Sequence, residues 1–444
     1  MNRQAATPRG FERRVQDLQL ARVPDPRQAA KVRIPLTSLL VALVASMVTR
    51  ARSLRAAEQR TAGMALKHGR FLGIESRIAD NSFGKMLPRL ELNALVGCLH
   101  RLVKAEHRRG NLAPCHLALG TVAIDGKNAG TVRWHDLCRI FGLEPQAASV
   151  LEVRARLAAR YPEAQLCVPG HGEPYALMRM HTVTLISSAA ATGVHLRPVM
   201  GSTNEIGSMV ELLDELAGAY GRTRLFGRIT TDSGNTSHLA MSTAIGHGWH
   251  YFAQMKSDVG DIYAEAKRLL GRRPRQRAHA TYSDAQNGKA VTYYLWCYDL
   301  GEQGWLKWTH ARQLMRVQRV TEDLVSGKKT VGNRYYISSE MPAALGPRVA
   351  LSVSRAHWRC ENETHWTADA EMREDRRRLA WSRHPNGILV VALLRMIAIA
   401  ILAMARRLSR MGGSHETPSW AQVAEHFFLL LCGSTLDTKA FDLV

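Results

Sequence analysis

Three short acidic motifs, far apart in the chain, contain the residue types that metal-dependent phosphodiester chemistry requires. They are Thr-Val-Ala-Ile-Asp125-Gly-Lys127, Ile-Thr-Thr-Asp232-Ser-Gly, and His-Trp-Arg-Cys-Glu361-Asn-Glu-Thr-His-Trp between 357 and 366. Mg²⁺ prefers carboxylate and water oxygens and keeps positions open for substrate phosphate. Cleavage without a covalent intermediate commonly uses two divalent cations about 3.5–4 Å apart. The three carboxylates therefore predict a site for two Mg²⁺, in which Mn²⁺ is expected to substitute.

The elements around the first two motifs predict how their carboxylates converge. Asp125 ends an apolar strand-like run, and Asp232 follows another. The β-type runs are 117–124, 181–188, 194–200, 225–230 and 250–255, with helical spacing after Asn204 and over 234–245. The predicted order β-β-β-α-β-α-β is that of an RNase H-like fold, in which the two strands are neighbours. Each Asp taken alone is more typical of a turn or a helix cap. The occurrence of all three acidic motifs in this order, in a basic chain, favours a metal site.

The third carboxylate is expected on a helix packed beside these strands. Residues 354–378 are predicted as one α-helix, in which Glu361 shares a face with His365 at 100° per residue. Glu374 points away from that face, and Asp375 returns to it about 21 Å further along the axis. One metal site could not use both Glu361 and Asp375, so Glu361 is the predicted ligand.

Basic and aromatic residues near these motifs are predicted to contact DNA. His365 is one helical turn from Glu361 and is expected near the scissile phosphate or the attacking water. Trp358 and Trp366 are expected to stack on a base near the cut, although such residues are more often core or surface. The predicted DNA-binding residues are Lys127, Lys256, Arg272, Arg273, Arg275, Trp358, Asn362, His365 and Trp366.

Composition favours a polyanionic partner. The 444 residues carry 60 Lys and Arg against 38 Asp and Glu, a formal charge of +22. Cations that neutralise phosphates release counterions, which drives binding to nucleic acid. A membrane surface and a merely solvated basic surface remain the alternatives. Residues 1–112 hold 21 Lys and Arg against 8 Asp and Glu, so this part is either a DNA-binding domain or a helical cap on the core.

The pattern predicts an α/β protein with an RNase H-like mixed-sheet core, an antiparallel β insertion and a basic helical N-terminal domain. The Asn287-Gly288 pair between two β-type runs predicts a hairpin in the insertion. The expected parts are a flexible basic N-terminus (1–30), a helical domain (31–112), the first core part (113–256, with a probable insertion at 131–175), a β-rich insertion (257–350), core helices with the catalytic Glu (351–412), and a C-terminal helix and tail (413–444).

Three observations favour a cytoplasmic protein that does not cross a membrane. The seven cysteines are scattered without a Cys-x-x-Cys pair, as in reduced cytosolic chains. The first residues lack the apolar segment of a secretory signal. The apolar runs 34–48 and 387–405 are expected to be buried helices, because the first is short for a span and the second carries Arg395 at its middle.

The chain resembles the ISAs-type insertion-sequence transposases, which belong to the DDE group with an RNase H-like core. The similarity covers roughly residues 25–410, and the run from 357 to 366 is its most specific motif. The matching segments are 122–127, 202–206, 230–232, the segment after the fifth strand at Lys256, 335–339, and 355–369 with 373–375.

The resemblance implies that Asp125, Asp232 and Glu361 form the metal-binding triad. It also implies a helical domain before the core, a β-rich insertion before the Glu, and assembly as a homo-oligomer on paired double-stranded DNA ends. The chain departs from the family where a Gln often follows the second Asp. It also lacks the related Tyr-x-x-Arg-x-x-x-Glu-x-x-x-x-x-x-Lys signature. The residues at these positions are Asn235 and Thr236, and Ser354, His357 and Ala368.

We therefore predict a DNA transposase that cuts element ends and joins the freed 3′-hydroxyl to target DNA. Two alternatives from the same residues are a catalytically inactive, transposase-like DNA-binding regulator and a metal-dependent nuclease without strand transfer. The inactive regulator would show no metal-dependent cleavage. The nuclease would cleave DNA but would give no joined products.

Overall fold

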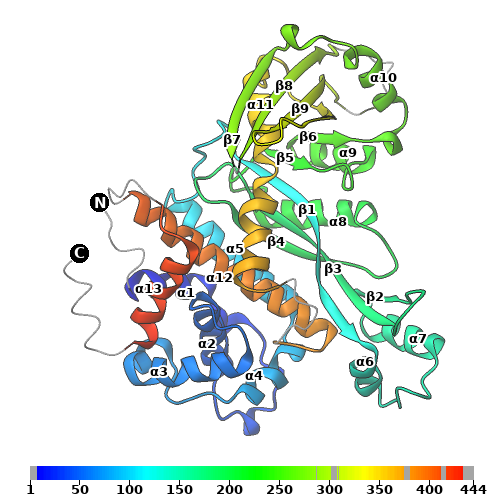
Figure 1. Ribbon diagram of the computed structural model, residues 1–444. Coiled ribbons are helices and arrows are strands. Elements are labelled where there is room, and N and C mark those ends of the chain that lie inside the picture. Colours follow the sequence, from blue (N-terminus) through cyan, green and yellow to red (C-terminus); the bar gives the residue numbers. More distant parts are fainter. Residues whose placement is uncertain are drawn as a thin grey trace.

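The computed structural model describes residues 8–433 except 287, 302–307, 309, 375–380 and 412–416. The described chain is mixed α/β, with ten strands in one mixed sheet (Figure 1). The strands are β1 (Thr121–Arg133), β2 (Ala164–Cys167), β3 (Tyr175–Leu185), β4 (Thr192–Val199), β5 (Arg228–Thr231), β6 (His250–Met255), β7 (Ala280–Gln286), β8 (Lys289–Asp299), β9 (Gln313–Asp323) and β10 (Lys329–Ser338).

Helices lie before, between and after the strands. The α-helices are α1 (Pro8–Leu18), α2 (Leu36–Val48), α3 (Leu54–Leu72), α4 (Asp80–Met86), α5 (Leu92–Arg108), α6 (Trp134–Phe141), α7 (Val150–Arg160), α8 (Met209–Tyr220), α9 (His238–Gly246), α10 (Asp261–Leu270), α11 (Pro347–Ala356), α12 (Pro385–Met411) and α13 (Trp420–Cys432).

The centre of the sheet has the element order expected from the sequence. Strand β1 pairs antiparallel with β3 and parallel with β5, and β5 pairs parallel with β6. Strand β4 pairs with β3 on its other side, and α8 and α9 follow β4 and β5 in the chain. One expectation was wrong: β1 does not end at Asp125 but continues to Arg133, because its second half pairs with β3 as far as Tyr175.

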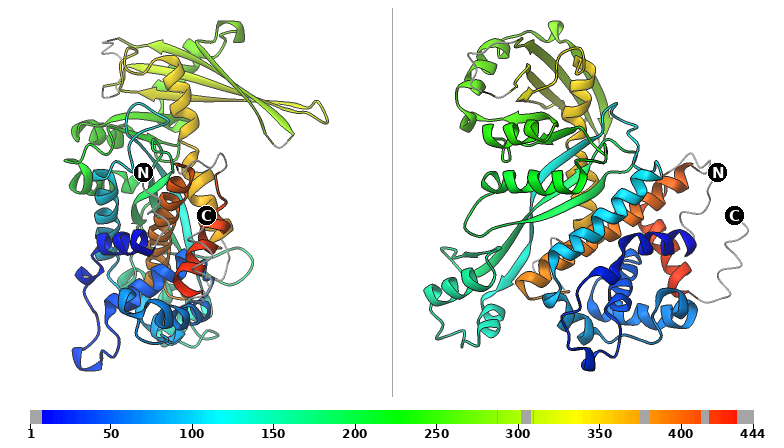
Figure 2. Two further views of the ribbon diagram at one scale, coloured as in Figure 1. Left: turned by 90° about the vertical axis from the view of Figure 1, so that its left-hand side faces the viewer. Right: turned by 180° about the vertical axis from the view of Figure 1, so that it is seen from behind.

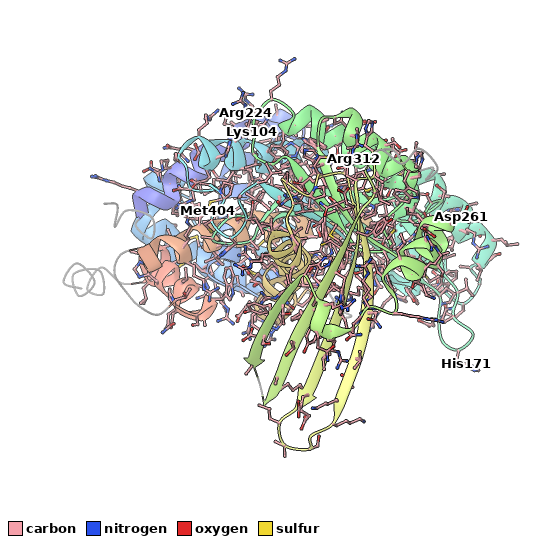
Figure 3. All side chains as sticks on the ribbon, turned by 90° about the horizontal axis from the view of Figure 1, so that it is seen from above. Lys104, His171, Arg224, Asp261, Arg312 and Met404 are labelled. Atoms are coloured by element: carbon pink, nitrogen blue, oxygen red, sulfur yellow. The ribbon has the colours of Figure 1, made fainter. Side chains whose placement is uncertain are left out.

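Segments 131–175 and 280–338 both extend this sheet. In the first segment, β2 pairs with the start of β3, and α6 and α7 lie beside that end of the molecule (Figure 1). In the second, β10 pairs with β6, and β9, β8 and β7 follow outward. Figure 3 shows the hairpin strands projecting beyond the rest of the chain. The residue Asn287 of the predicted hairpin turn lies outside the described residues.

The C-terminal helices pack against the N-terminal ones. Helix α12 contacts α2, α5 and α13 and also β4, and Figure 2 shows α5 and α12 side by side. Its segment Pro385–Arg407 is long and apolar enough to cross a membrane, but its most apolar window is completely buried within the chain. This agrees with the expected buried helix. Such a segment is weak evidence for a span, because core helices have the same length and composition.

The helix that carries the third motif differs from the expected one. It begins at Pro347 rather than at residue 354, and its regular α-helical part ends at Ala356. Residues Cys360–His365 and Thr367–Glu371 are π-helical. Wide π turns are rare and often occur at functional sites. The α-helical spacing of 100° per residue, which the sequence analysis used for this segment, therefore does not apply beyond Cys360. Residues 375–378 of the expected helix lie outside the described residues.

A buried histidine pair joins α5 to β4. His100 Nε2 lies 2.9 Å from His195 Nδ1, and His195 Nε2 lies 3.0 Å from Glu215 Oε2 on α8. Burial, followed by the charge of His195, lowers the pKa of His100 to about 3. The unfolded chain binds this proton near the ordinary His pKa of about 6.5. Stability is therefore lost as the pH falls below about 6.5, until the folded pKa is reached.

His100→Gln should make the free energy of unfolding less sensitive to acid. Wild type and variant would be unfolded in urea at about pH 7.5 and about pH 5. The variant should lose less stability between these values, because it has no buried imidazole that must remain neutral. His171→Gln, at an exposed position, is the matched control. An equal acid-induced loss in wild type and His100→Gln would contradict the assignment.

Candidate active site

The sheet register places Asp125 and Asp232 next to each other. In the parallel pair β1/β5, Ile124 is the partner of Thr231, so the two aspartates are the next residues on adjacent strands. Asp125 is buried and Asp232 is partly exposed. The expected adjacency of the two strands is confirmed, and it brings the backbones of Asp125 and Asp232 close together.

Two histidines dock the segment with Glu361 across the strands. His357 Nδ1 lies 2.9 Å from Thr230 Oγ1 on β5, and His365 Nε2 lies 2.7 Å from Thr182 Oγ1 on β3. Thr182 is the register partner of Asp125 on β1. Because its two docking points lie on the strands that flank β1, the helical segment crosses β1. Glu361 lies midway between the two histidines and is exposed.

His365 also contacts the carboxylate of Asp125. Its Nδ1 lies 3.5 Å from Asp125 Oδ2, and the Cys360 thiol lies 3.9 Å from the same oxygen. Burial, followed by the charge of Lys127, lowers the pKa of His365 to about 4. The imidazole is therefore neutral at physiological pH, and this contact is not an ion pair. The structure thus places His365 beside Asp125 and hydrogen-bonded to Thr182, and its contact with a phosphate or water stays a prediction.

Burial and neighbouring carboxylates raise the pKa values of Asp125 and Glu361. Burial, followed by the charges of Asp232, Glu361 and Glu205, raises the pKa of Asp125 to about 7. Burial also raises the pKa of Glu361, with Arg334 opposing and Asp232 adding to the shift. Clustered acids with shifted pKa values are typical of functional sites, although structural networks produce them too.

Glu205 is a fourth carboxylate that the sequence analysis did not assign to the site. A Cβ atom at Gly126 would lie 2.3 Å from its carboxylate oxygen Oε1, so this carboxylate packs directly on the backbone beside Asp125. Burial, followed by the charge of Asp232, raises the pKa of Glu205. The sequence analysis expected a helix after Asn204 and matched segment 202–206 to the resembling family, but it gave Glu205 no role. The signal in the sequence was Gly126 directly after Asp125, because a residue without a side chain allows another group to pack closely on the backbone.

Asn235 orients the second aspartate. Its backbone N–H and its side-chain Nδ2 donate to Asp232 Oδ1 at 3.0 and 2.8 Å. Its own Oδ1 is buried without a hydrogen-bond partner within the described residues. Asn235 occupies the region where the resembling family often has Gln, and here it fixes one Asp232 oxygen while the other is left for a ligand.

Lys127 is enclosed by acidic residues. Its Nζ lies 2.9 Å from Asp369 Oδ1 and 2.8 Å from Glu374 Oε2, and Glu374 lies 3.5 Å from Arg395 on α12. Glu374 is buried, and Lys127 lowers its pKa. The predicted contact of Lys127 with DNA would require these ion pairs to break. In the structure the cluster instead joins β1, the segment after the π turns, and the apolar helix α12.

The other predicted DNA contacts lie at different places around the site. Lys256 is about half exposed and pairs with Asp258, and its charge opposes the burial that raises the pKa of Glu205. Asn362 and Trp366 are exposed. The ring of Trp358 is covered by the guanidinium of Arg334 at 4.1 Å. These positions remain compatible with the predicted contacts, which the structure does not test.

The basic loop of Arg272, Arg273 and Arg275 lies after α10. Arg316, which is buried, donates to the backbone carbonyls of Leu270 and Arg273 and so holds the loop. Arg275 donates to Gln318 Oε1 at 2.6 Å, and Arg272 is exposed. The sequence analysis found the loop but not Arg316, since one Arg within a β-type run gives no sign of burial.

The candidate site has oxygen ligands of the kind that bind a hard divalent cation, but the side chains that the structure describes are not arranged around a common metal position. Within the described chain, no group of three or more His, Cys, Asp or Glu side chains is arranged to hold a metal ion. The oxygens of Asp125, Asp232, Glu205 and Glu361 are nevertheless the type that Mg²⁺ prefers. Burial, followed by the charges of Asp232 and Glu361, raises the pKa of Asp125, and a bound cation would favour its charged form. The residues therefore fit the group by their chemistry.

No protein-family model matches the chain, and no curated protein matches it significantly. The functional interpretation consequently depends on the residues and their geometry.

Proposed function

We propose that the protein is a DNA transposase of the DDE type, with Asp125, Asp232 and Glu361 as its metal-binding carboxylates. The observation that carries the proposal is the placement of Asp125 on β1 and of Asp232 directly after the adjacent parallel strand β5, with the Glu361 segment docked across these strands. The strand order β4-β3-β1-β5-β6 supports an RNase H-like core, for which this is the expected place of the ligands.

The proposed reaction depends on the divalent metal ions that these carboxylates would bind. Two bound Mg²⁺ would activate the attacking oxygen and stabilise the leaving oxygen. Asp232 is held by two hydrogen bonds from Asn235, and Asp125 packs against His365 and Cys360, so the surroundings of both carboxylates exist before substrate binds. Water would break the bond between phosphorus and the 3′ oxygen, leaving a 3′-hydroxyl and a 5′-phosphate. That hydroxyl would then attack a target phosphate and release a new target 3′-hydroxyl.

A basic groove among the N-terminal helices supports a polyanionic partner. It has a volume of about 620 Å³ and lies between the segment before α2 and the α4 region. Its exposed cations are Lys31, Arg33, Lys85 and Arg89, and Arg27 at its edge is paired with Asp25. A simple helical cap on the core does not require this concentration of exposed charge, so the groove favours a DNA-binding role for these helices.

Lys31→Gln with Lys85→Gln should weaken DNA binding to the same extent for every sequence. Each lost phosphate contact should reduce the slope of log affinity against log salt by about 0.9. Fluorescence anisotropy of a labelled duplex at several salt concentrations measures both effects. Arg139→Gln with Arg154→Gln, on α6 and α7, removes the same charge elsewhere and is the control. Equal losses in both double variants would show that only net charge matters.

The proposal is tested by offering the protein DNA that carries the ends flanking its own gene. Metal-dependent nicks with a 3′-hydroxyl, followed by joining to a second duplex, are the expected products. Nicks without joining would favour a nuclease without strand transfer. Tight binding with no nick in Mg²⁺ or Mn²⁺ would favour a DNA-binding regulator. Assembly as a homo-oligomer on paired ends and a cytoplasmic location are parts of the same proposal.

A further inference from the structure

A groove of about 290 Å³ lies between the projecting strands and α11, next to the candidate active site. Strands β8, β9 and β10 form one wall, and Ser354, Arg355 and Trp358 form the other. Pockets for small ligands have volumes of roughly 300–1,000 Å³, so this groove has room for one nucleotide but not for a length of double helix.

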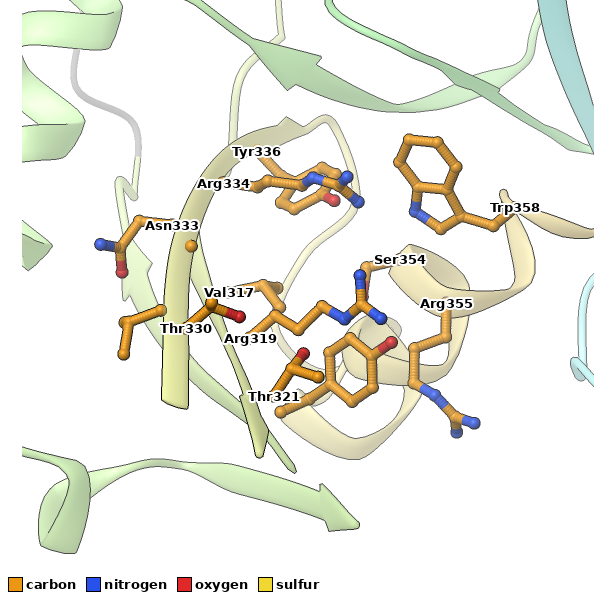
Figure 4. A pocket seen from close by; sticks show the side chains of 13 residues that line it. Val317, Arg319, Thr321, Thr330, Asn333, Arg334, Tyr336, Ser354, Arg355 and Trp358 are labelled. Carbon is orange, nitrogen blue, oxygen red and sulfur yellow. The ribbon is translucent and has the colours of Figure 1, made fainter. Parts of the chain in front are cut away.

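Three Arg side chains line the groove. Arg319, Arg334 and Arg355 all line it, and within the described residues none of the three forms an ion pair. Figure 4 shows Arg319 and Arg334 reaching from the strands toward Ser354 and Trp358. An Arg side chain presents its donors in a planar fork that suits phosphate oxygens. The groove therefore offers a site for one phosphate.

Aromatic side chains lie around the same space. Tyr293, Tyr336 and Trp358 line the groove, and the Arg334 guanidinium lies 4.1 Å from the centroid of the Trp358 ring. Arg355 lies over Tyr282 and extends toward Tyr293, at 3.2 and 5.6 Å from their ring centroids. Aromatic rings and Arg planes stack on nucleobases without selecting one base, because every base has a π face.

The groove is electrostatically connected to the carboxylate site. The charge of Arg334 acts on Glu361, where it opposes the rise in pKa that burial causes, and Trp358 precedes Glu361 by three residues in the segment that crosses β1. A nucleotide in the groove would consequently belong to a strand that passes close to the carboxylates. Charge, shape and location together favour an unpaired nucleotide of the DNA rather than a free metabolite.

We propose that this groove binds one unstacked nucleotide of the DNA strand beside the cut. Its phosphate lies between Arg319 and Arg334, and its base lies among the rings of Tyr293 and Trp358. The inference rests on the proposed function because it takes DNA as the partner. It adds that DNA with one nucleotide out of the helix is the preferred substrate.

The test compares three labelled duplexes of one sequence in EDTA, so that no cleavage occurs. One duplex is fully paired, one carries a single unpaired adenosine, and one carries an abasic residue at the same bulge. Wild type should bind the adenosine bulge about 10-fold more tightly than either other duplex, as expected for stacking one base. The abasic duplex has the same interruption of the helix without the base, so it separates base binding from recognition of flexible DNA.

Tyr293→Ala should reduce the preference for the adenosine bulge over the abasic bulge to less than about twofold, because it removes a ring from the base site. Arg319→Ala should weaken binding of both bulged duplexes, because it removes a phosphate contact that they share, and Arg319→Lys should recover only part of this binding, since Lys lacks the planar fork. Arg154→Ala, at an exposed position like Arg319, should leave both preferences unchanged. Equal binding of the adenosine and abasic bulges by wild type, or an unchanged base preference in Tyr293→Ala, would overturn the proposal. Failure of wild type to cut DNA in Mg²⁺ would overturn the proposed function without altering this comparison.

Discussion

Asp232→Asn should reduce metal-dependent cleavage by at least roughly 10²-fold, the smallest loss typical when one group that stabilises transition-state charge is removed. The change removes a negative charge but keeps the shape of the side chain. The amide oxygen can still accept from the Asn235 N–H, which now donates to Asp232 Oδ1 at 3.0 Å. We therefore expect normal folding and DNA binding within about twofold of wild type, while the nick is lost.

The control for this variant is Asp214→Asn, which removes an exposed carboxylate that pairs with His247. It should cut DNA at the wild-type rate. Retained cleavage by Asp232→Asn would exclude the assignment of the triad. Both variants are compared on the same DNA in Mg²⁺ and in Mn²⁺, with binding measured separately in EDTA.

The two glutamates near the aspartates can be distinguished in the same assay. Glu361→Gln should abolish cleavage if Glu361 is the third ligand, and Glu205→Gln should then have the smaller effect. Glu205 contacts the backbone at Gly126, whereas Glu361 is exposed and lies at the centre of the docked segment. The reverse order of effects would assign the third carboxylate to Glu205, with the aspartates unchanged in their roles.

The central strands and their order could be predicted because each is a short apolar run bounded by turn residues. The sequence indicates burial on both faces, and parallel neighbours follow from the helices between them. The full length of β1 could not be predicted. Beyond Asp125 its residues Gly126, Lys127 and Asn128 are polar or small, and only pairing with β3 keeps them in the sheet. Local sequence carries no information about a partner some 50 residues away.

The candidate site was predicted in its acidic residues but not in the groups that orient them. Asp125, Asp232 and Glu361 are conspicuous because of their positions relative to strands and to an aromatic helix. Glu205 and Asn235 were not assigned, since their roles depend on a close approach to Gly126 and on a turn after β5. The π turns after Cys360 were also not predicted, because a regular helix is the default for such a segment.

Arg228→Met should cost about 3–5 kcal/mol in the free energy of unfolding, the loss typical when one partner of a buried ion pair is removed. Arg228 begins β5 and donates from Nε and Nη2 to the two oxygens of Glu340, at 2.5 and 2.7 Å. Both side chains are at most 3% exposed. Nη1 also donates to Thr121 Oγ1 at the start of β1. The pair therefore connects the strands that carry both aspartates to the end of β10.

The cost arises because Glu340 would remain buried without a cation, rather than because the ion pair is strongly favourable by itself. Arg228→Met combined with Glu340→Leu should consequently recover much of the lost stability. The exposed cross-strand pair of Lys329 and Glu322 provides the control, and Lys329→Met should change stability by less than about 1 kcal/mol. Urea unfolding of all four proteins with a common slope measures these differences. A double variant as unstable as Arg228→Met alone would show that lost packing, not the unpaired carboxylate, accounts for the effect.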